Sequence, residues 1–153
     1  MRAAILRALA GIAALVLPAS VFAAEPVPDM KGDWVGQSYT IIAGSGGHWP
    51  ASAGTFDKPG LYQKDLVIRV TNQIDRRFWG VTILPGSDPK SAEPFIGELT
   101  GKDNHFAVFV DTDGYFSGEI SGDTLSFCYT QAGGGQDSKT PAVISCTDVR
   151  HQH

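Results

Sequence analysis

The chain has 153 residues, with 12 basic and 16 acidic side chains and a formal net charge of −4. This length corresponds to one domain, and a hydrophobic content of 42% is too high for a disordered chain. The acidic balance argues against a protein that binds duplex nucleic acid, because such a protein needs a basic face. The 18 glycines, among many β-branched and aromatic residues, indicate an all-β fold with tight turns.

Residues 1–23 have the pattern of a cleaved signal peptide. Arg2 and Arg7 give a positive start, residues 8–17 are apolar, and residues 21–23 fit a cleavage site. The apolar run of about 10 residues is too short to span a bilayer, and no cysteine follows it to accept a lipid. We therefore expect a periplasmic or secreted chain of 153 − 23 = 130 residues with no membrane span.

Alternating apolar residues, with turn residues between the runs, predict eight β-strands after this leader. The expected strands are 33–42, 64–72, 76–84, 93–100, 105–111, 115–120, 123–130 and 141–150. Sequential hairpins of this kind pair antiparallel in up-and-down order. The expected organisation is a lead-in at 24–32, a β-barrel domain at 33–150 and a flexible tail at 151–153.

An aromatic residue followed two positions later by glycine occurs in four of these strands. The pairs are Trp34 and Gly36, Phe78 and Gly80, Phe95 and Gly97, and Phe116 and Gly118. Because side chains alternate across a strand, each ring shares a face with its glycine. A glycine weakens a flat strand, so its recurrence favours strongly coiled strands in a small closed barrel. An open two-layer sandwich is the alternative.

The two cysteines, Cys128 and Cys146, predict one disulfide in an exported chain, with two reactive thiols as the alternative. A final hairpin centred near Asp137 places Cys128 opposite Cys146 and Leu125 opposite Val149. The disulfide then lies on the outer face of the barrel.

The links between the expected strands differ in length at the two ends of the barrel. The links at 72–75, 101–104 and 121–123 are tight and share one end. The links at 43–63, 85–92 and 131–140 are longer and share the other end. This distribution predicts a cup whose loop-rich mouth carries the function.

The start of the first strand, Gly32-Asp33-Trp34, resembles the G-x-W signature of the calycin barrels, which are the lipocalins and avidins. The repeated Phe-x-Gly pattern is also similar to that of avidins. The resemblance implies a small cup-shaped barrel in which Arg150 closes the base against Trp34. By strand parity, Arg150 can reach Trp34 only if the last strand bulges after Val149.

The resemblance does not extend to biotin binding. The positions at which an avidin contacts biotin hold Gly36, Thr40, Thr82 and Leu84, and no tryptophan follows Trp79. The ligand therefore has to be inferred from other residues.

The longest link supplies the candidate ligand-binding residues, which are His48, Trp49, Phe56 and Tyr62. They would form a lid over the mouth, because long ordered loops are more often functional than short ones. The alternative is that Trp49 packs onto the barrel rim and His48 is a passive neighbour.

Two other groups of residues have weaker patterns. Asp111 and Asp113 are similar to the start of a calcium loop, but a strand follows at once, so a hairpin turn with solvated carboxylates is expected. His151 and His153 give two metal ligands on a terminal tail, where fraying is expected instead.

These observations predict an exported small-ligand-binding or carrier barrel for an apolar or mixed ligand, with no cofactor and no metal centre. The alternative is an exported protein–protein interaction or inhibitor module that uses the same rim. No catalytic constellation indicates an enzyme. The filling of the barrel separates the two functions. If side chains such as Phe78, Phe106 and Phe116 fill the interior, the interaction module is favoured. A cavity of a few hundred Å³ that reaches the mouth would favour ligand binding.

Overall fold

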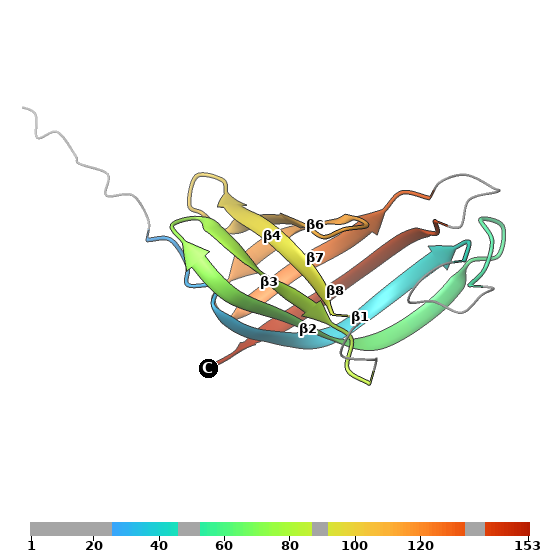
Figure 1. Ribbon diagram of the computed structural model, residues 1–153, viewed down its shortest axis with the longest axis horizontal. Helices are drawn as coiled ribbons and strands as arrows, with labels where there is room; N and C mark the ends of the chain where they lie inside the picture. The colour runs from blue at the N-terminus through green and yellow to red at the C-terminus, as the bar shows by residue number, and fades with distance from the viewer. Residues whose placement is uncertain (1–25, 46–52, 87–91, 134–139) are drawn as a thin grey trace, which may run out of the picture.

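The computed structural model describes residues 26–45, 53–86, 92–133 and 140–153, which form a closed barrel of eight antiparallel strands in up-and-down order (Figure 1). The strands are β1 (Gly32–Ala43), β2 (Gly60–Ile74), β3 (Arg77–Ile83), β4 (Glu93–Thr100), β5 (Phe106–Val110), β6 (Tyr115–Ser121), β7 (Thr124–Gln131) and β8 (Ala142–Gln152). Because β1 pairs with both β2 and β8, the sheet has no free edge. The expected all-β barrel is confirmed, and the open sandwich is wrong.

The glycines on the inner face allow neighbouring strands to come close together. A Cβ atom added at Gly36, Gly80 or Gly118 would lie 2.4, 1.8 or 2.1 Å from a carbonyl oxygen of the adjacent strand. At Gly97 it would lie 2.6 Å from atoms of both Phe78 and Phe109, so here a ring covers the gap. These positions therefore need glycine for the curvature that closes the barrel.

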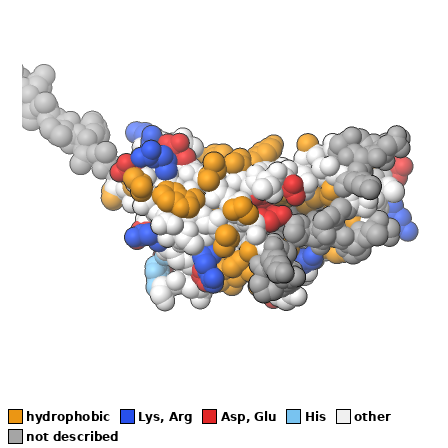
Figure 2. All heavy atoms as spheres, viewed as in Figure 1, with side chains coloured by type: hydrophobic (Ala, Val, Ile, Leu, Met, Phe, Trp, Pro, Cys, Tyr) orange, Lys and Arg blue, Asp and Glu red, His pale blue; other side chains and the backbone are white. Residues whose placement is uncertain are grey.

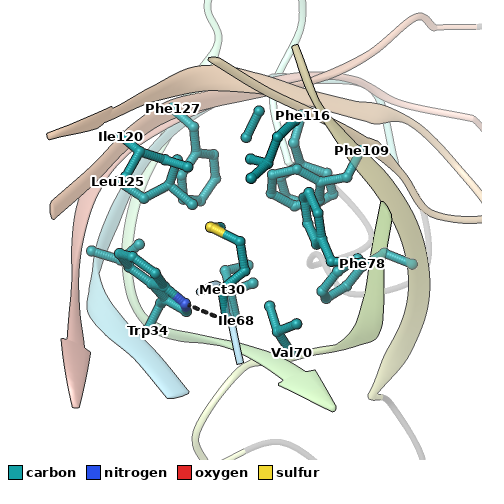
Figure 3. Packing of buried hydrophobic residues seen from close by; sticks show 14 of the residues in the cluster. Met30, Trp34, Ile68, Val70, Phe78, Phe109, Phe116, Ile120, Leu125 and Phe127 are labelled. Atoms are coloured by element: carbon teal, nitrogen blue, oxygen red, sulfur yellow. Dashed lines mark hydrogen bonds between the residues drawn. The ribbon is translucent and has the colours of Figure 1, made fainter. Parts of the chain in front are cut away.

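Apolar side chains that point inward fill the half of the barrel nearer the C-terminus (Figure 3). The buried cluster includes Met30, Trp34, Leu66, Ile68, Val70, Phe78, Phe95, Leu99, Ala107, Phe109, Phe116, Ile120, Leu125, Phe127 and Val149. Phe106 was expected in this cluster, but its side chain is on the outer face of β5 and is half-buried. Phe109, three residues later, points inward instead. Phe109 stacks on Phe116 with ring centroids 4.2 Å apart.

The disulfide joins β7 and β8 on the outer face. Cys128 and Cys146 are directly paired, with Cα atoms 4.0 Å apart, and Leu125 is paired with Val149. The predicted bond and register are both confirmed. Closing a loop with a sequence separation of 18 residues contributes about 3 kcal/mol in the chain-entropy model.

The base of the barrel is closed by a histidine, and the expectation for Arg150 is wrong. Arg150 is exposed on the outer face opposite Val35. The next residue, His151, faces inward and stacks on Trp34 with centroids 4.5 Å apart and planes 13° apart. Strand β8 keeps its alternation without a bulge after Val149 and continues to Gln152, so the expected loose tail is largely strand.

The lead-in segment acts as a plug in the same end of the barrel. Met30 is fully buried, and its carbonyl accepts a 2.8 Å hydrogen bond from the indole Nε1–H of Trp34. Its backbone N–H donates to Oε1 of Gln73 over 2.6 Å. Figure 3 shows the Met30 side chain inside the ring formed by the wall residues. The sequence pattern did not identify this role, because one methionine before a strand carries no periodic signal.

The connections confirm that the two poles differ. At the pole where the C-terminus lies, β2 and β3, β4 and β5, and β6 and β7 are joined by tight turns (Figure 1). The opposite pole carries the longer connections 44–59, 84–92 and 132–141, together with the short turn 111–114. We call the first the closed pole and the second the open pole.

An exposed ion pair at the closed pole predicts a pH effect on stability. Both oxygens of Asp33 accept hydrogen bonds from Arg69, over 2.7 and 2.8 Å, and these bonds lower the pKa of Asp33 from its usual value. The pair therefore stabilises the fold above the unfolded-state pKa of about 3.9, and this contribution is lost as the pH falls through the lowered folded pKa. We expect Asp33→Asn to be less stable than the parent at pH 7, and the difference to narrow at pH 3, in urea unfolding. A difference that is equal at both pH values would contradict this.

Candidate functional site

The inner wall changes from apolar to polar beyond the main cluster, and on β1 and β8 it ends in the buried apolar pair Ile42 and Val143 at the open pole. Five buried hydroxyl side chains line it there: Ser38, Thr40, Thr82, Ser145 and Thr147. They lie on the same inward-facing positions of β1, β3 and β8 that carry apolar residues nearer the closed pole. The half of the barrel nearer the open pole therefore offers hydrogen-bonding groups to its interior.

These hydroxyls use their protons mainly within the wall. Thr40 Oγ1 donates to Ser145 Oγ over 2.8 Å, and Ser38 Oγ donates to the backbone carbonyl of Lys64 over 3.2 Å. The Thr147 hydroxyl donates to the carbonyl of Gln37. Because a hydroxyl oxygen also has lone pairs, these groups can still accept hydrogen bonds from a ligand.

Three carboxylates lie around the same end of the interior, and we call Glu93, Asp111 and Asp113 the acidic rim. Asp111 Oδ1 accepts hydrogen bonds from the backbone N–H groups of Asp113 and Gly114, over 2.9 and 2.7 Å, so the expected turn is confirmed. In the described parts of the chain, no Lys or Arg forms an ion pair with Asp111 or Asp113.

The phenol of Tyr129 lies in the negative field of this rim. Burial raises the pKa of Tyr129, and the charges of Asp111, Glu93 and Asp113 raise it further. The phenol is therefore neutral at physiological pH. Its hydroxyl group donates to Gln131 Oε1 over a long 3.4 Å contact.

A small cavity connects the hydroxyls, the acidic rim and the aromatic floor. Its volume is about 90 Å³, below the roughly 300–1,000 Å³ of pockets for drug-sized ligands. The lining includes Ser38, Thr40, Thr82, Glu93, Asp111, Asp113, Phe116, Phe127, Tyr129 and Ser145. Among the described lining residues, three are acidic and none is basic. The barrel is thus mostly filled by its own side chains, and its cavity is smaller than the few hundred Å³ expected of a carrier. The remaining space is lined by apolar side chains as well as by hydroxyls and carboxylates.

Of the predicted lid residues, the structure describes Phe56 and Tyr62, and neither lines this cavity. His48 and Trp49 lie outside the described residues. Phe56 is 76% exposed and borders a hollow on the outer wall. Tyr62 is half-buried and packs against a second apolar cluster of Ile42, Ala53 and Val143.

Sequence reasoning missed the acidic rim because its parts lie far apart in the chain. Asp111 and Asp113 belong to the β5–β6 turn, whereas Glu93 begins β4. The turn at 111–114 was predicted correctly, but its position at the open pole follows only from the up-and-down order of all the strands. The hairpin register places Tyr129 on the inner face, and the same parity along β4 would have placed Glu93 there.

The outer wall carries an unusual row of exposed apolar side chains, which we call the outer belt. Its members are Leu61, Ile41, Ile144, Tyr115, Val110, Ile96 and Trp79. Each is paired in register with its neighbour across the strands, with Thr130 completing the row between β8 and β6. Hydrophobic side chains gather visibly over β3 and β4 (Figure 2). Contiguous apolar surface of this kind is typical of interaction sites.

Comparison of the chain with models of known families, with curated proteins and with solved structures finds no match. Among the described residues there is no helix with the length and apolar character needed to cross a membrane.

Proposed function

We propose that this chain is an exported ligand-binding barrel whose open pole binds the cationic group of a small amine. The acidic rim around a cavity with no described basic lining residue is the observation that carries this proposal. A ligand ammonium group donates hydrogen bonds only, and it would meet the carboxylates of Asp111 and Asp113 and the acceptor oxygens of the wall. The signal-peptide pattern of residues 1–23 and the disulfide support export.

The size and floor of the cavity limit the ligand further. A volume of about 90 Å³ admits a short chain and excludes a drug-sized body. Phe116 and Phe127 form an apolar floor beneath the hydroxyls, on which a few methylene groups would rest. A short alkylammonium ion therefore fits the cavity, with its ammonium group at the acidic rim and its methylene groups on the aromatic floor.

Titration of the protein with n-butylammonium, followed by amide NMR shifts, tests this proposal. We expect saturable shifts at Asp113 and Gly114, and none with butyrate, because the rim repels a carboxylate. Asp113→Asn keeps the side-chain shape and removes one charge, so we expect about tenfold weaker binding, equivalent to about 1.4 kcal/mol.

Asp103→Asn is the matched control, because Asp103 is exposed in the β4–β5 turn at the closed pole. It should bind butylammonium as the parent does. Equal binding of butyrate and butylammonium, or an equal loss in both variants, would refute a rim-specific site.

A second candidate function, self-association, is favoured by the outer belt. A hollow of about 480 Å³ on this wall is lined by Trp79, Ile96 and Val110, with Arg77 and Glu98 beside it. Arg77 and Glu98 already pair with Asp75 and Arg76 of the same chain, so the apolar side chains are the part of this wall without a partner in the described chain. A twofold-related copy would cover them with the same apolar surface. We therefore infer that a second copy of the chain is the partner that fits this wall.

Sedimentation of the protein at increasing concentration tests this second function. We expect a dimer that Ile96→Lys abolishes, since Ile96 is 68% exposed in the belt and a lysine there would have to be desolvated. Ser126→Lys adds the same charge at an exposed position outside the belt and should leave the dimer intact. A parent that remains monomeric at all concentrations would exclude this function.

A further inference from the structure

The closed pole brings together three metal-ligating side chains that the ligand-binding proposal does not use. Asp123 lies in the β6–β7 turn, and its backbone carbonyl accepts a 2.9 Å hydrogen bond from the N–H of His151. His153 follows two residues later on the same side of the chain, and its Nε2 is 3.0 Å from Asp123 Oδ1. One ligand atom from each of the three residues lies within 4.8 Å of the others.

His151 is held in place by contacts with β1 and with Lys31, the residue before that strand. Its ring stacks on Trp34, and its Nε2 lies 2.7 Å from the backbone carbonyl of Lys31. A Cβ atom at Gly32 would lie 2.7 Å from the same Nε2, so glycine is needed to seat the ring. The position of His151 is therefore fixed before any ion binds.

These contacts also fix which nitrogen of His151 can bind a metal. A carbonyl oxygen only accepts hydrogen bonds, so the neutral ring carries its proton on Nε2 and its lone pair on Nδ1. The Nε2 and Cδ2 edge of the ring faces Gly32, so Nδ1 lies on the side of the ring away from Gly32. A metal-binding histidine typically donates its second N–H to a carbonyl or carboxylate in this way.

We propose that His151, His153 and Asp123 bind one divalent transition-metal ion of the Zn²⁺ type. Two imidazoles and a carboxylate are suitable ligands, and three protein ligands leave a fourth position for water. Bonds of about 2.0–2.1 Å to a tetrahedral ion separate its ligand atoms by about 3.3 Å. His153 and Asp123 are exposed, so their side chains can make the small movement required. The bound ion would join the end of β8 to the β6–β7 turn.

Titration of the tag-free, chelator-treated protein with Zn²⁺ by calorimetry, and with Co²⁺ by visible absorption, tests the site. We expect one ion per chain and the strong visible bands of four-coordinate Co²⁺. His153→Gln and Asp123→Asn each remove an exposed ligand, so each should weaken Zn²⁺ binding at least tenfold. Both variants should fold, because neither side chain is part of the core, and their melting temperatures without metal would verify this.

His105→Gln is the matched control, since His105 is exposed in the β4–β5 turn of the same pole and is not in the cluster. It should bind Zn²⁺ like the parent. Failure to saturate at one ion per chain, or unchanged affinity in folded His153→Gln and Asp123→Asn, would overturn the proposal. An equal loss in His105→Gln would overturn it as well.

Discussion

Gly80→Ala is expected to destabilise the barrel by roughly 3 kcal/mol, at the upper end of the usual cost of overpacking. The new Cβ atom would lie 1.8 Å from the carbonyl oxygen of Arg69 and 3.0 Å from the Cα atom of Val70. Both are backbone atoms, so no side-chain rotation relieves the clash, and β2 and β3 must separate. Denaturant unfolding would measure the loss, and thermal unfolding should show a fall of about 10 °C in melting temperature.

Gly133→Ala is a matched control for this substitution. A Cβ atom at Gly133 would meet the nearest atoms of Ala142 at 3.1 and 3.2 Å, which a small shift can accommodate. We expect a change of less than about 1 kcal/mol. Equal losses of stability in the two variants would show that the close approach of β2 and β3 at Gly80 is not needed for the closed barrel.

Trp34→Ala should lower the free energy of unfolding by about 4 kcal/mol, in the range measured for large aromatic residues replaced in cores. The indole is only 2% exposed, bonds to the carbonyl of Met30 and stacks on His151. Its loss would leave a cavity, free the Met30 plug and remove the support of the His151 ring. Denaturant unfolding and hydrogen exchange of the Met30 amide would both report this.

Trp79→Ala provides the comparison, because Trp79 lies on the outer belt and is 37% exposed. Its replacement should cost about 1 kcal/mol, since part of the ring is already in water. A similar cost for both tryptophans would mean that Trp34 does not anchor the base.

The sequence predicted the strands well because their signal is local. Alternation and turn residues located all eight strands, and the pairing of Cys128 with Cys146 followed from the position of one hairpin. The largest boundary error was at β2, which begins at Gly60 instead of 64. There the strand extends above the apolar core, and its alternation of apolar and polar side chains is weak.

The errors occurred where the face of a strand, or a partner far along the chain, decides the outcome. Phe106 and Phe109 are both aromatic, and only the register of β5 shows that Phe109 points inward. His151 was assigned to a frayed tail because nothing in the local sequence reveals Trp34 behind it. The candidate site was therefore only partly predictable: the turn of Asp111 and Asp113 was identified, but not its assembly with Glu93.

The sequence by itself determined the eight-stranded all-β architecture, and it favoured the closed barrel, the disulfide and the difference between the poles, because strand period, turn chemistry and glycine spacing act over a few residues. The tertiary structure alone decided which groups meet at each pole. Closing the sheet brings the ends of distant strands together, and it creates the acidic rim at one pole and the group of Asp123, His151 and His153 at the other. Such groups depend on the order and register of all eight strands, and no local segment of the chain encodes them.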